Sequence, residues 1–135
     1  MRITADTNLL VRIVVRDDAE QARIAYELVS NAQSVAISLP CLCEVVWVLE
    51  RIYDFETTDL MDAVRMIVGS INAVFDEAPV DAGLRTLEAG GDFADGVIAA
   101  AGNALGGEIF VSFDRKAVTK LNVLGLPARD ARDLA

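Results

Sequence analysis

Four acidic side chains are the residues of this sequence whose types and positions could do chemistry together. Asp6 directly follows the segment RITA, and Asp114 follows IFVSF. Glu44 lies one turn into a segment that follows VAISL, and Asp95 opens the segment FADGVIAAA. In open parallel sheets, ligand sites form outside the carboxyl ends of the strands. If these apolar segments are parallel strands, the four carboxylates are expected to meet at one edge of the sheet.

A site built from four carboxylates needs cations. Two carboxylates about 4 Å apart repel each other by about 4 kcal/mol at an effective dielectric constant of about 20. The chain contains no histidine, which excludes histidine-based acid–base or nucleophilic catalysis and imidazole-ligated zinc. Oxygen ligands without histidine or cysteine select a hard ion, so the sequence predicts Mg²⁺ or Mn²⁺.

A magnesium site made of acids suits phosphodiester hydrolysis, because the metal polarises the phosphate and lowers the pKa of a water molecule. The chain has 21 acidic and 12 basic residues, a net charge of −9, which argues against a broad basic surface that grips nucleic acid. Phosphate contacts would therefore come from local cations, each of which taken alone is an ordinary solvated charge. The candidates are Arg12, Arg16, Arg115 and Lys116.

Helix capping is the alternative explanation for these acids. Asp is a favoured N-cap, and Asp92-Phe-Ala-Asp95 before an apolar run is a workable capping box. Asp6 and Asp114 also stand where helices begin. Helical spacing, however, places Asp95 on one face with Ile98, which we expect to be a packing face. We therefore expect Asp92 mainly to cap its helix and Asp95 mainly to hold metal.

Glu44 is the most diagnostic of the four acids. It is the only charged residue between Gln33 and Leu49. Its neighbours at one helical turn include Cys41, Trp47 and other apolar residues, so an ordinary solvated face is not expected there.

The elements that must position these residues alternate between strands and helices. This order predicts an α/β fold, with a central parallel sheet flanked by helices on both faces. A length of 135 residues and the absence of a linker or repeat favour one domain spanning 1–135. Strands are expected at 2–5, 35–39, 73–75 and 109–112 and near residue 124; helices are expected at 7–15, 18–30, 40–53, 57–71, 80–89, 93–105 and 115–121.

Composition also bears on the cellular compartment. The longest uncharged run, 28–43, contains Ser, Asn, Gln and Pro, so no membrane span is expected. Asp6 and Arg12 interrupt the first apolar stretch, which is therefore no signal peptide. Cys41 and Cys43, spaced C-x-C, are expected to be reduced and buried. These features predict a cytoplasmic protein.

Four segments together resemble a known family. They are DTNLLVRIVVRDD at 6–18, ISLPCLCEVVWVLE at 37–50, GGDFADGVIAAAG at 90–102 and FVSFDRKA at 110–117. In this order they resemble the PIN-domain ribonucleases, and most closely the VapC-type toxins of VapBC toxin-antitoxin pairs. The resemblance implies a PIN fold, Mg²⁺- or Mn²⁺-dependent endoribonuclease activity on RNA, a homodimer, and inhibition by a cognate VapB-type antitoxin whose tail blocks the acidic site.

The resemblance also implies a role for individual residues. Those that match the family's metal-binding acids are Asp6, Glu44, Asp95 and Asp114. Asp92 matches the first acid of the DFAD segment and is expected to be a helper or a cap. Asn8 and Ser112 are expected to be polar supports of the site.

Two other classes of protein remain open from the residues. A phospho-acceptor receiver domain would use an acidic pair such as Asp17-Asp18 with Ser112 and Lys116, but its acidic pair should end the first strand, where this chain has Asp6 alone. A non-catalytic interaction module could use the apolar segment VVWVL or the helix near 60–68 as a partner face. We expect these apolar segments to form core and a dimer contact.

Overall fold

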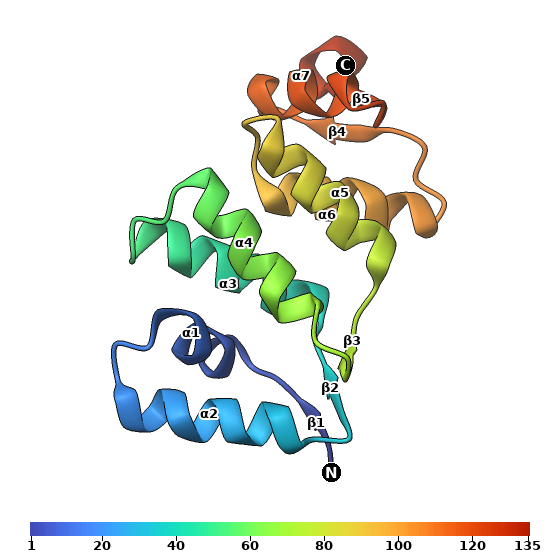
Figure 1. Ribbon diagram of the computed structural model, residues 1–135. Coiled ribbons are helices and arrows are strands. Elements are labelled where there is room, and N and C mark those ends of the chain that lie inside the picture. Colours follow the sequence, from blue (N-terminus) through green and yellow to red (C-terminus); the bar gives the residue numbers. More distant parts are fainter. The chain divides into compact units, whose positions relative to one another are not determined.

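The protein forms two compact units. A computed structural model describes residues 1–135, and contacts divide it into Met1–Asp76 and Glu77–Ala135. We call these unit 1 and unit 2 and describe each by itself. Figure 1 shows unit 1 in blue to green and unit 2 in yellow to red.

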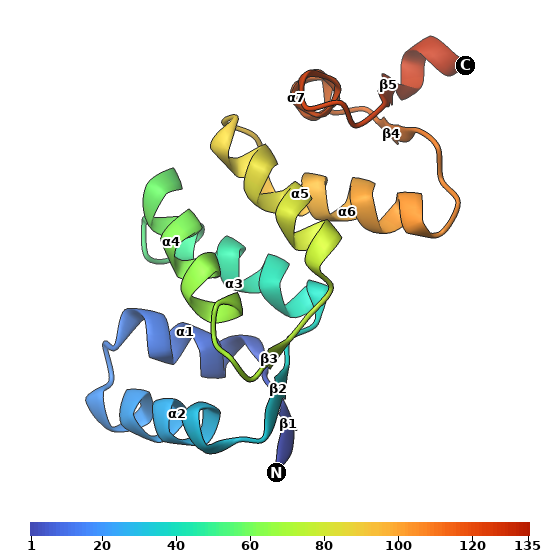
Figure 2. The ribbon, with the colours of Figure 1, turned by 45° about the vertical axis from the view of Figure 1, so that its right-hand side comes forward.

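Unit 1 is built on a three-stranded parallel sheet. The strands β1 (Arg2–Thr4), β2 (Ser34–Ala36) and β3 (Ala73–Val74) pair in the order β1-β2-β3. Parallel strands require crossover connections. Here each crossover consists of two helices, α1 (Thr7–Val15) with α2 (Ala19–Asn31), then α3 (Leu39–Arg51) with α4 (Thr57–Val68). In Figures 1 and 2, α1 lies beside α2 and α3 lies beside α4.

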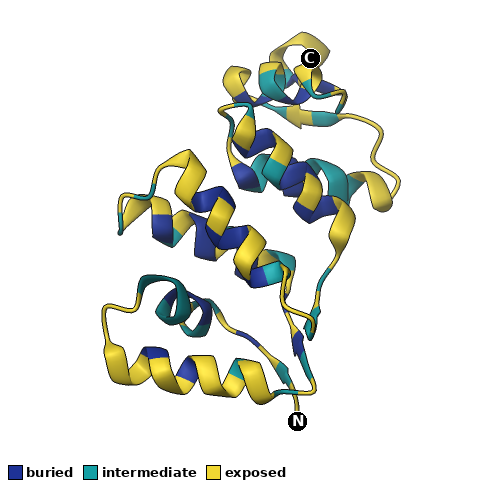
Figure 3. Ribbon diagram, viewed as in Figure 1, coloured by how far each residue is buried: buried dark blue, intermediate teal, exposed yellow.

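The core of unit 1 lies between α3 and its neighbouring helices. The fully buried residues recur at helical spacing, with Leu42, Val45 and Leu49 on α3 and Leu60 and Val64 on α4. Burial of each such side chain contributes about 1.5–3 kcal/mol. Figure 3 shows these buried segments in dark blue along one face of each helix. This packing holds α3, and with it Glu44, in a fixed place.

Unit 2 combines a helical hairpin with a two-stranded parallel sheet. The helices α5 (Glu77–Glu88) and α6 (Phe93–Ala104) pack closely, with Phe93 fully buried. The strands β4 (Phe110–Ser112) and β5 (Ala128–Asp130) pair in parallel, and α7 (Arg115–Val123) connects them. A 3₁₀ helix, η1 (Ala131–Leu134), ends the chain.

These elements confirm the predicted α/β class. Several boundaries differ from expectation, and the three described next have local reasons. Strand β2 ends early because the Ser38 hydroxyl accepts a hydrogen bond from the Cys41 N–H and starts α3. Helix α5 starts at Glu77, since Pro79 is tolerated in a first helical turn. The last strand lies at Ala128–Asp130 because Leu124 still caps α7. None of the helices is both long enough and apolar enough to cross a membrane.

The two cysteines form no disulfide. Cys41 is buried, and burial raises the pKa of its thiol. Cys43 is only half-buried, because it lies on the neighbouring, more exposed side of α3. The prediction of burial therefore holds for Cys41 alone.

Glycine allows α5 and α6 to approach each other. A Cβ atom added at Gly96 would clash with the Thr86 Oγ1 atom and would lie 2.5 Å from the carbonyl oxygen of Ala82, both on α5. Thr86 is itself buried, and its hydroxyl donates to that carbonyl at 2.7 Å. The contact therefore requires glycine on the first turns of α6, close to Asp95.

We expect Gly96→Ala to lower the stability of the protein by about 1–3 kcal/mol, the usual cost of overpacking a close contact. Gly102 is the matched control, because it lies on the same helix and an added Cβ would meet nothing within 4 Å. Gly102→Ala should raise stability by about 0.5–1 kcal/mol through helix propensity alone. Urea unfolding of both variants checks this, and equal effects would contradict the close packing at Gly96.

Candidate active site

Two of the predicted metal-binding acids lie together in unit 1. Asp6 stands at the carboxyl end of β1 and caps α1, where its Oδ1 atom accepts from the Leu9 N–H at 2.9 Å. Asp6 and Glu44 line one hollow of about 540 Å³, and Asn8 lines it as well. The cap uses one carboxylate oxygen of Asp6 and leaves the other for a ligand. The structure thus brings Asp6, Asn8 and Glu44 to one place.

The surroundings of Glu44 differ from the sequence expectation. Glu44 is exposed, and neighbouring Trp47 is 55% exposed. This side of α3 is therefore not a packing face. Cys41, one turn earlier, is buried. Glu44 therefore lies at the edge of the core, where its side chain lines the hollow. It forms no hydrogen bond or ion pair within the protein.

Arg12 lines the same hollow and belongs to a network that the sequence did not reveal. Its Nη1 atom lies 2.6 Å from Asp17, and the Tyr53 hydroxyl donates to the other oxygen of Asp17 at 3.1 Å. The hydrogen bond to Arg12 lowers the pKa of Asp17. The Nε atom of Arg12 is buried without a hydrogen-bond partner. Arg12 therefore keeps one donor unused at the wall of the acidic hollow.

Sequence reasoning missed the roles of Asp17 and Tyr53. The contact between them spans 36 positions, and no spacing rule predicts a contact of that kind. The adjacent Asp18 caps α2 through the Gln21 N–H. The acidic pair considered for a receiver domain is thus divided between an ion pair and a helix cap.

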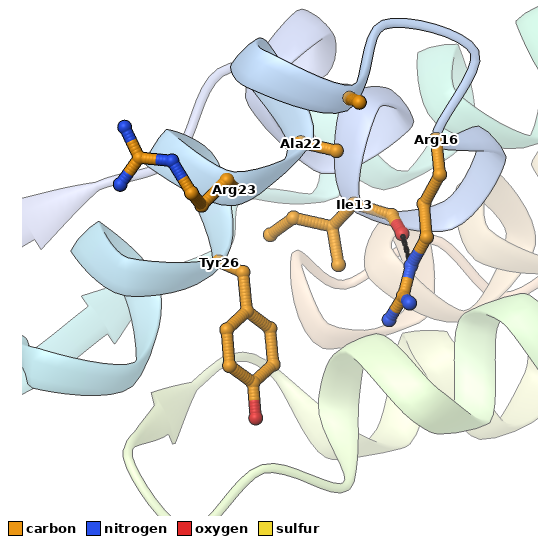
Figure 4. Close-up of a pocket in the computed structure, with 6 residues that line it drawn as sticks. Ile13, Arg16, Ala22, Arg23 and Tyr26 are labelled. Atoms are coloured by element: carbon orange, nitrogen blue, oxygen red, sulfur yellow. Dashed lines mark hydrogen bonds between the residues drawn. The ribbon is translucent and has the colours of Figure 1, made fainter.

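Arg16 lines a different hollow from Arg12. Figure 4 shows this second hollow, of about 520 Å³, between α1 and α2. Arg16 ends α1 in the left-handed region, with φ 58°, and its Nε atom donates to the Ile13 carbonyl. Arg23 and Tyr26 complete the wall from α2. The change of backbone direction at the end of α1 removes Arg16 from the face that carries Arg12.

Three acids lie near one another in unit 2. Asp92 caps α6, accepting from the Ala94 N–H at 3.2 Å, which confirms the predicted cap. Asp114 follows β4 and caps α7, accepting from the Ala117 N–H at 3.1 Å. The Ser112 hydroxyl accepts from the N–H of Asp114 at 3.0 Å, so Ser112 orients the backbone that carries this acid. Asp95, in the first turn of α6, forms no hydrogen bond or ion pair.

The negative charge of Asp95 is not neutralised by any basic side chain. Burial, followed by the negative charges of Asp92 and Asp114, raises its pKa to about 6. The expectation that Asp95 shares a packing face with Ile98 is wrong, because Ile98 is 57% exposed. Even so, Asp95 is half-buried beside two other acids and has no cation to neutralise it. Such a carboxylate is a ready ligand for a positive ion.

The two cations that follow Asp114 behave differently. Arg115 donates from Nε to Asp130 at 3.1 Å, while most of its side chain stays exposed. Lys116 is exposed and forms no ion pair. Both lie on the first turn of α7, directly after Asp114.

The chemistry of the donor atoms fits a hard divalent ion. Asp6 and Glu44 in unit 1, and Asp95 and Asp114 in unit 2, each have at least one carboxylate oxygen outside any internal hydrogen bond. No group of three or more acidic or cysteine side chains that could hold a metal ion is formed in the structure. The convergence of all four acids on one site stays a prediction.

A comparison with protein-family models decides the family. The PIN domain model matches residues 3–121, which is most of the chain. The chain belongs to the PIN domain family. PIN domains are generally nucleases, and they typically use divalent metal ions. A search of curated proteins found no match. Membership of the PIN family removes the receiver-like alternative, and it agrees with acids placed at strand ends.

The raised pKa of Asp95 predicts a pH-dependent stability. Because folding raises this pKa from 3.8 to about 6, the folded state binds the proton more tightly, and the charge of Asp95 destabilises the protein increasingly between about pH 4 and 6. In EDTA, we expect Asp95→Asn to raise the melting temperature by roughly 2–4 °C above pH 6. The difference should vanish below about pH 4.

Asp81→Asn provides the control for this melting series, since Asp81 is an exposed carboxylate on α5 of the same unit. Its effect should be small at every pH. If Asp95→Asn lowered the melting temperature above pH 6, the charge of Asp95 would stabilise the start of α6, and the predicted repulsion would be wrong.

Proposed function

We propose that this PIN domain is a metal-dependent endoribonuclease, the toxin of a type II toxin-antitoxin pair of the VapC type. The observation that carries the proposal is that several acids at helix starts keep carboxylate oxygens available for a ligand. Asp6 and Asp114 each use one oxygen to begin a helix, and Asp95 is held half-buried beside other carboxylates without a cation. A protein without a ligand at these acids would gain stability by losing the charge of Asp95.

Mg²⁺ or Mn²⁺ is the ion that these residues would hold, through Asp6, Glu44, Asp95 and Asp114. When bound, such an ion polarises the scissile phosphate and activates water for hydrolysis. Other residues of the chain would position these acids. Asn8 lies in the hollow of Asp6 and Glu44, and Ser112 fixes the backbone of Asp114. Asp92 keeps the start of α6, and thus Asp95, in place.

Arg12 is the best supported of the proposed phosphate contacts. Its guanidinium lies at the wall of the acidic hollow, held by Asp17, and its buried Nε donor lacks a partner. A phosphate that entered the hollow would be attracted by the positive charge of this guanidinium. In unit 2, Lys116 and Arg115 are exposed directly after Asp114 and are the proposed phosphate contacts of that unit. Arg16 lines the other hollow and is the weakest of the four.

The remaining parts of the proposal concern partners and compartment. A cognate VapB-type antitoxin would block the acidic site, RNA would be the substrate, and two copies of the chain would form a homodimer. The exposed apolar side chains of Trp47 on α3 and of Ile52, which caps that helix, support a contact with a second copy. Cys41 and Cys43 form no disulfide, which agrees with action in the reducing cytoplasm.

Cleavage of a structured RNA pool tests the enzyme. We expect cuts with Mg²⁺ or Mn²⁺ and none with EDTA, and more than about a 100-fold loss of rate in Asp6→Asn and in Asp95→Asn. Because Asn is as good an N-cap as Asp, the first variant keeps the start of α1 intact. Circular dichroism checks that both variants are folded.

Asp81→Asn, remote from any proposed role, should cleave like the wild type. The endoribonuclease proposal would be wrong if folded, antitoxin-free wild-type protein cut no RNA under any of these conditions. Cuts that persist in EDTA would instead leave a nuclease without the proposed metal.

Light scattering tests the homodimer. The chain has a mass of 14.5 kDa, so we expect a particle of twice that mass, about 29 kDa, in dilute solution. Replacing Trp47 by a charged residue, Trp47→Glu, should shift the particle towards the monomer, because a buried charge at an interface is costly. A wild-type particle of monomer mass at all concentrations would contradict the dimer.

A further inference from the structure

One segment of unit 2 is rich in cations, although the protein as a whole is acidic. Residues 113–132 contain five cations and two acids, a net charge of +3 (5 − 2), whereas the whole chain carries −9. The cations are Arg115, Lys116, Lys120, Arg129 and Arg132. They lie on α7, β5 and η1; Arg115, Lys116, Arg129 and Arg132 are exposed and Lys120 is half-buried. A local positive potential of this kind attracts an anion despite the net charge.

An exposed aromatic ring lies within this region. Phe113, between β4 and the start of α7, is 69% exposed and immediately precedes Asp114. The guanidinium carbon of Arg132 lies 5.4 Å from the centre of the Phe113 ring, within the range of a cation–π interaction. The same arginine donates to the Phe113 carbonyl at 3.3 Å. Ring and guanidinium are therefore held together at the surface.

Asp130 fixes the position of this arginine. The Nη1 atom of Arg132 donates to both carboxylate oxygens of Asp130, at 2.9 and 2.8 Å, and the Arg132 N–H donates to one of them at 2.9 Å. Asp130 is only 9% exposed and also accepts from Arg115 Nε. The backbone hydrogen bond of Arg132, aided by both guanidinium groups, lowers the pKa of Asp130. Asp130 thus holds both arginines in one geometry. Their side chains have therefore lost conformational entropy before any ligand binds.

We propose that Phe113 and Arg132 form a stacking subsite for one unpaired base of the RNA substrate. Single-stranded RNA is bound through bases that stack on aromatic rings and arginine planes, while nearby cations contact its phosphates. Phe113 is the neighbour of Asp114, and adjacent Cα atoms are about 3.8 Å apart. A nucleotide bound at the acids of unit 2 would therefore lie close to the segment that carries the ring.

This subsite deepens the proposed nuclease function and rests on it. It gives the enzyme a contact with the base, which the acids and phosphate contacts do not provide. Stacking tolerates all four bases but favours those that stack strongly, so Phe113 influences which phosphodiester bond is cut. The other nitrogen atoms of Arg132, Nε and Nη2, form no hydrogen bond within the protein and are open to the base edge.

Binding of two oligonucleotides tests the subsite. One is a fluorescein-labelled single-stranded RNA of about ten nucleotides, and the other has the same backbone without bases. Fluorescence anisotropy in Mg²⁺ would use an Asp95→Asn background, so that the RNA stays intact. We expect Phe113→Leu to weaken binding of the intact RNA by about five- to hundredfold and to leave the abasic RNA unaffected. Phe113→Tyr, which restores an aromatic ring, should restore the preference.

Lys116→Ala serves as the comparison, because loss of a phosphate contact should weaken both oligonucleotides equally and reduce the salt dependence. Arg132→Met should reduce the preference for bases in the same manner as Phe113→Leu. A loss limited to the intact RNA indicates stacking, whereas an equal loss for both oligonucleotides indicates charge attraction alone.

Three outcomes would overturn the subsite: no binding of RNA at all, an equal loss for both oligonucleotides in Phe113→Leu, or unchanged binding in that variant. Unchanged binding together with loss of the dimer by light scattering would mean that a second copy covers Phe113.

Cleavage assays distinguish failure of the subsite from failure of the proposed nuclease. If wild-type protein cuts RNA but the cut positions are the same in Phe113→Leu, the endoribonuclease stands without the subsite. Base-dependent binding without cleavage would support stacking at Phe113, but it would overturn the endoribonuclease and with it the role of the subsite in the choice of the cut.

Discussion

Repulsion between carboxylates is the constraint on which this structure depends. Asp92, Asp95 and Asp114 lie close enough that burial and mutual repulsion raise the pKa of Asp95 to about 6. Helix N-termini offset part of this cost, because backbone N–H groups and the positive end of the helix dipole favour negative charge. Asp92 caps α6 and Asp114 caps α7 in unit 2, and Asp6 caps α1 in unit 1. The capping interpretation and the ligand interpretation of these acids are therefore compatible, since a cap occupies one oxygen.

The arginines show how the protein places positive charge beside its acids without neutralising them. Arg12 is held by Asp17, and Arg115 and Arg132 are held by Asp130, so neither set binds Asp6, Asp95 or Asp114. An ion pair to one of those acids would have removed the ligand that a metal needs. The acids Asp17 and Asp130 act as anchors, which leaves other guanidinium donors directed to an incoming anion.

Close packing keeps this charged region rigid. Gly96 lets α6 lie against α5 one residue after Asp95, and the buried Phe93 fixes the start of the same helix. In unit 1, the buried residues of α3 surround the turn that carries Glu44. An acid on a rigid helix cannot relax away from its neighbours, so its repulsion persists until a cation binds.

The sequence by itself determined the α/β class, most helix starts and the strand-end positions of Asp6 and Asp114, because these depend on local signals. Asp before a helix, Pro in a first turn and apolar periodicity act within a few residues. Only the tertiary structure showed that Tyr53 binds Asp17, that Asp130 holds Arg132, and that Arg16 leaves the face of Arg12. It also showed that Ile98 is exposed and that the last strand starts at Ala128. Contacts between residues far apart in sequence, and exposure, arise from packing between elements, and that packing has no signature in a local run of residues.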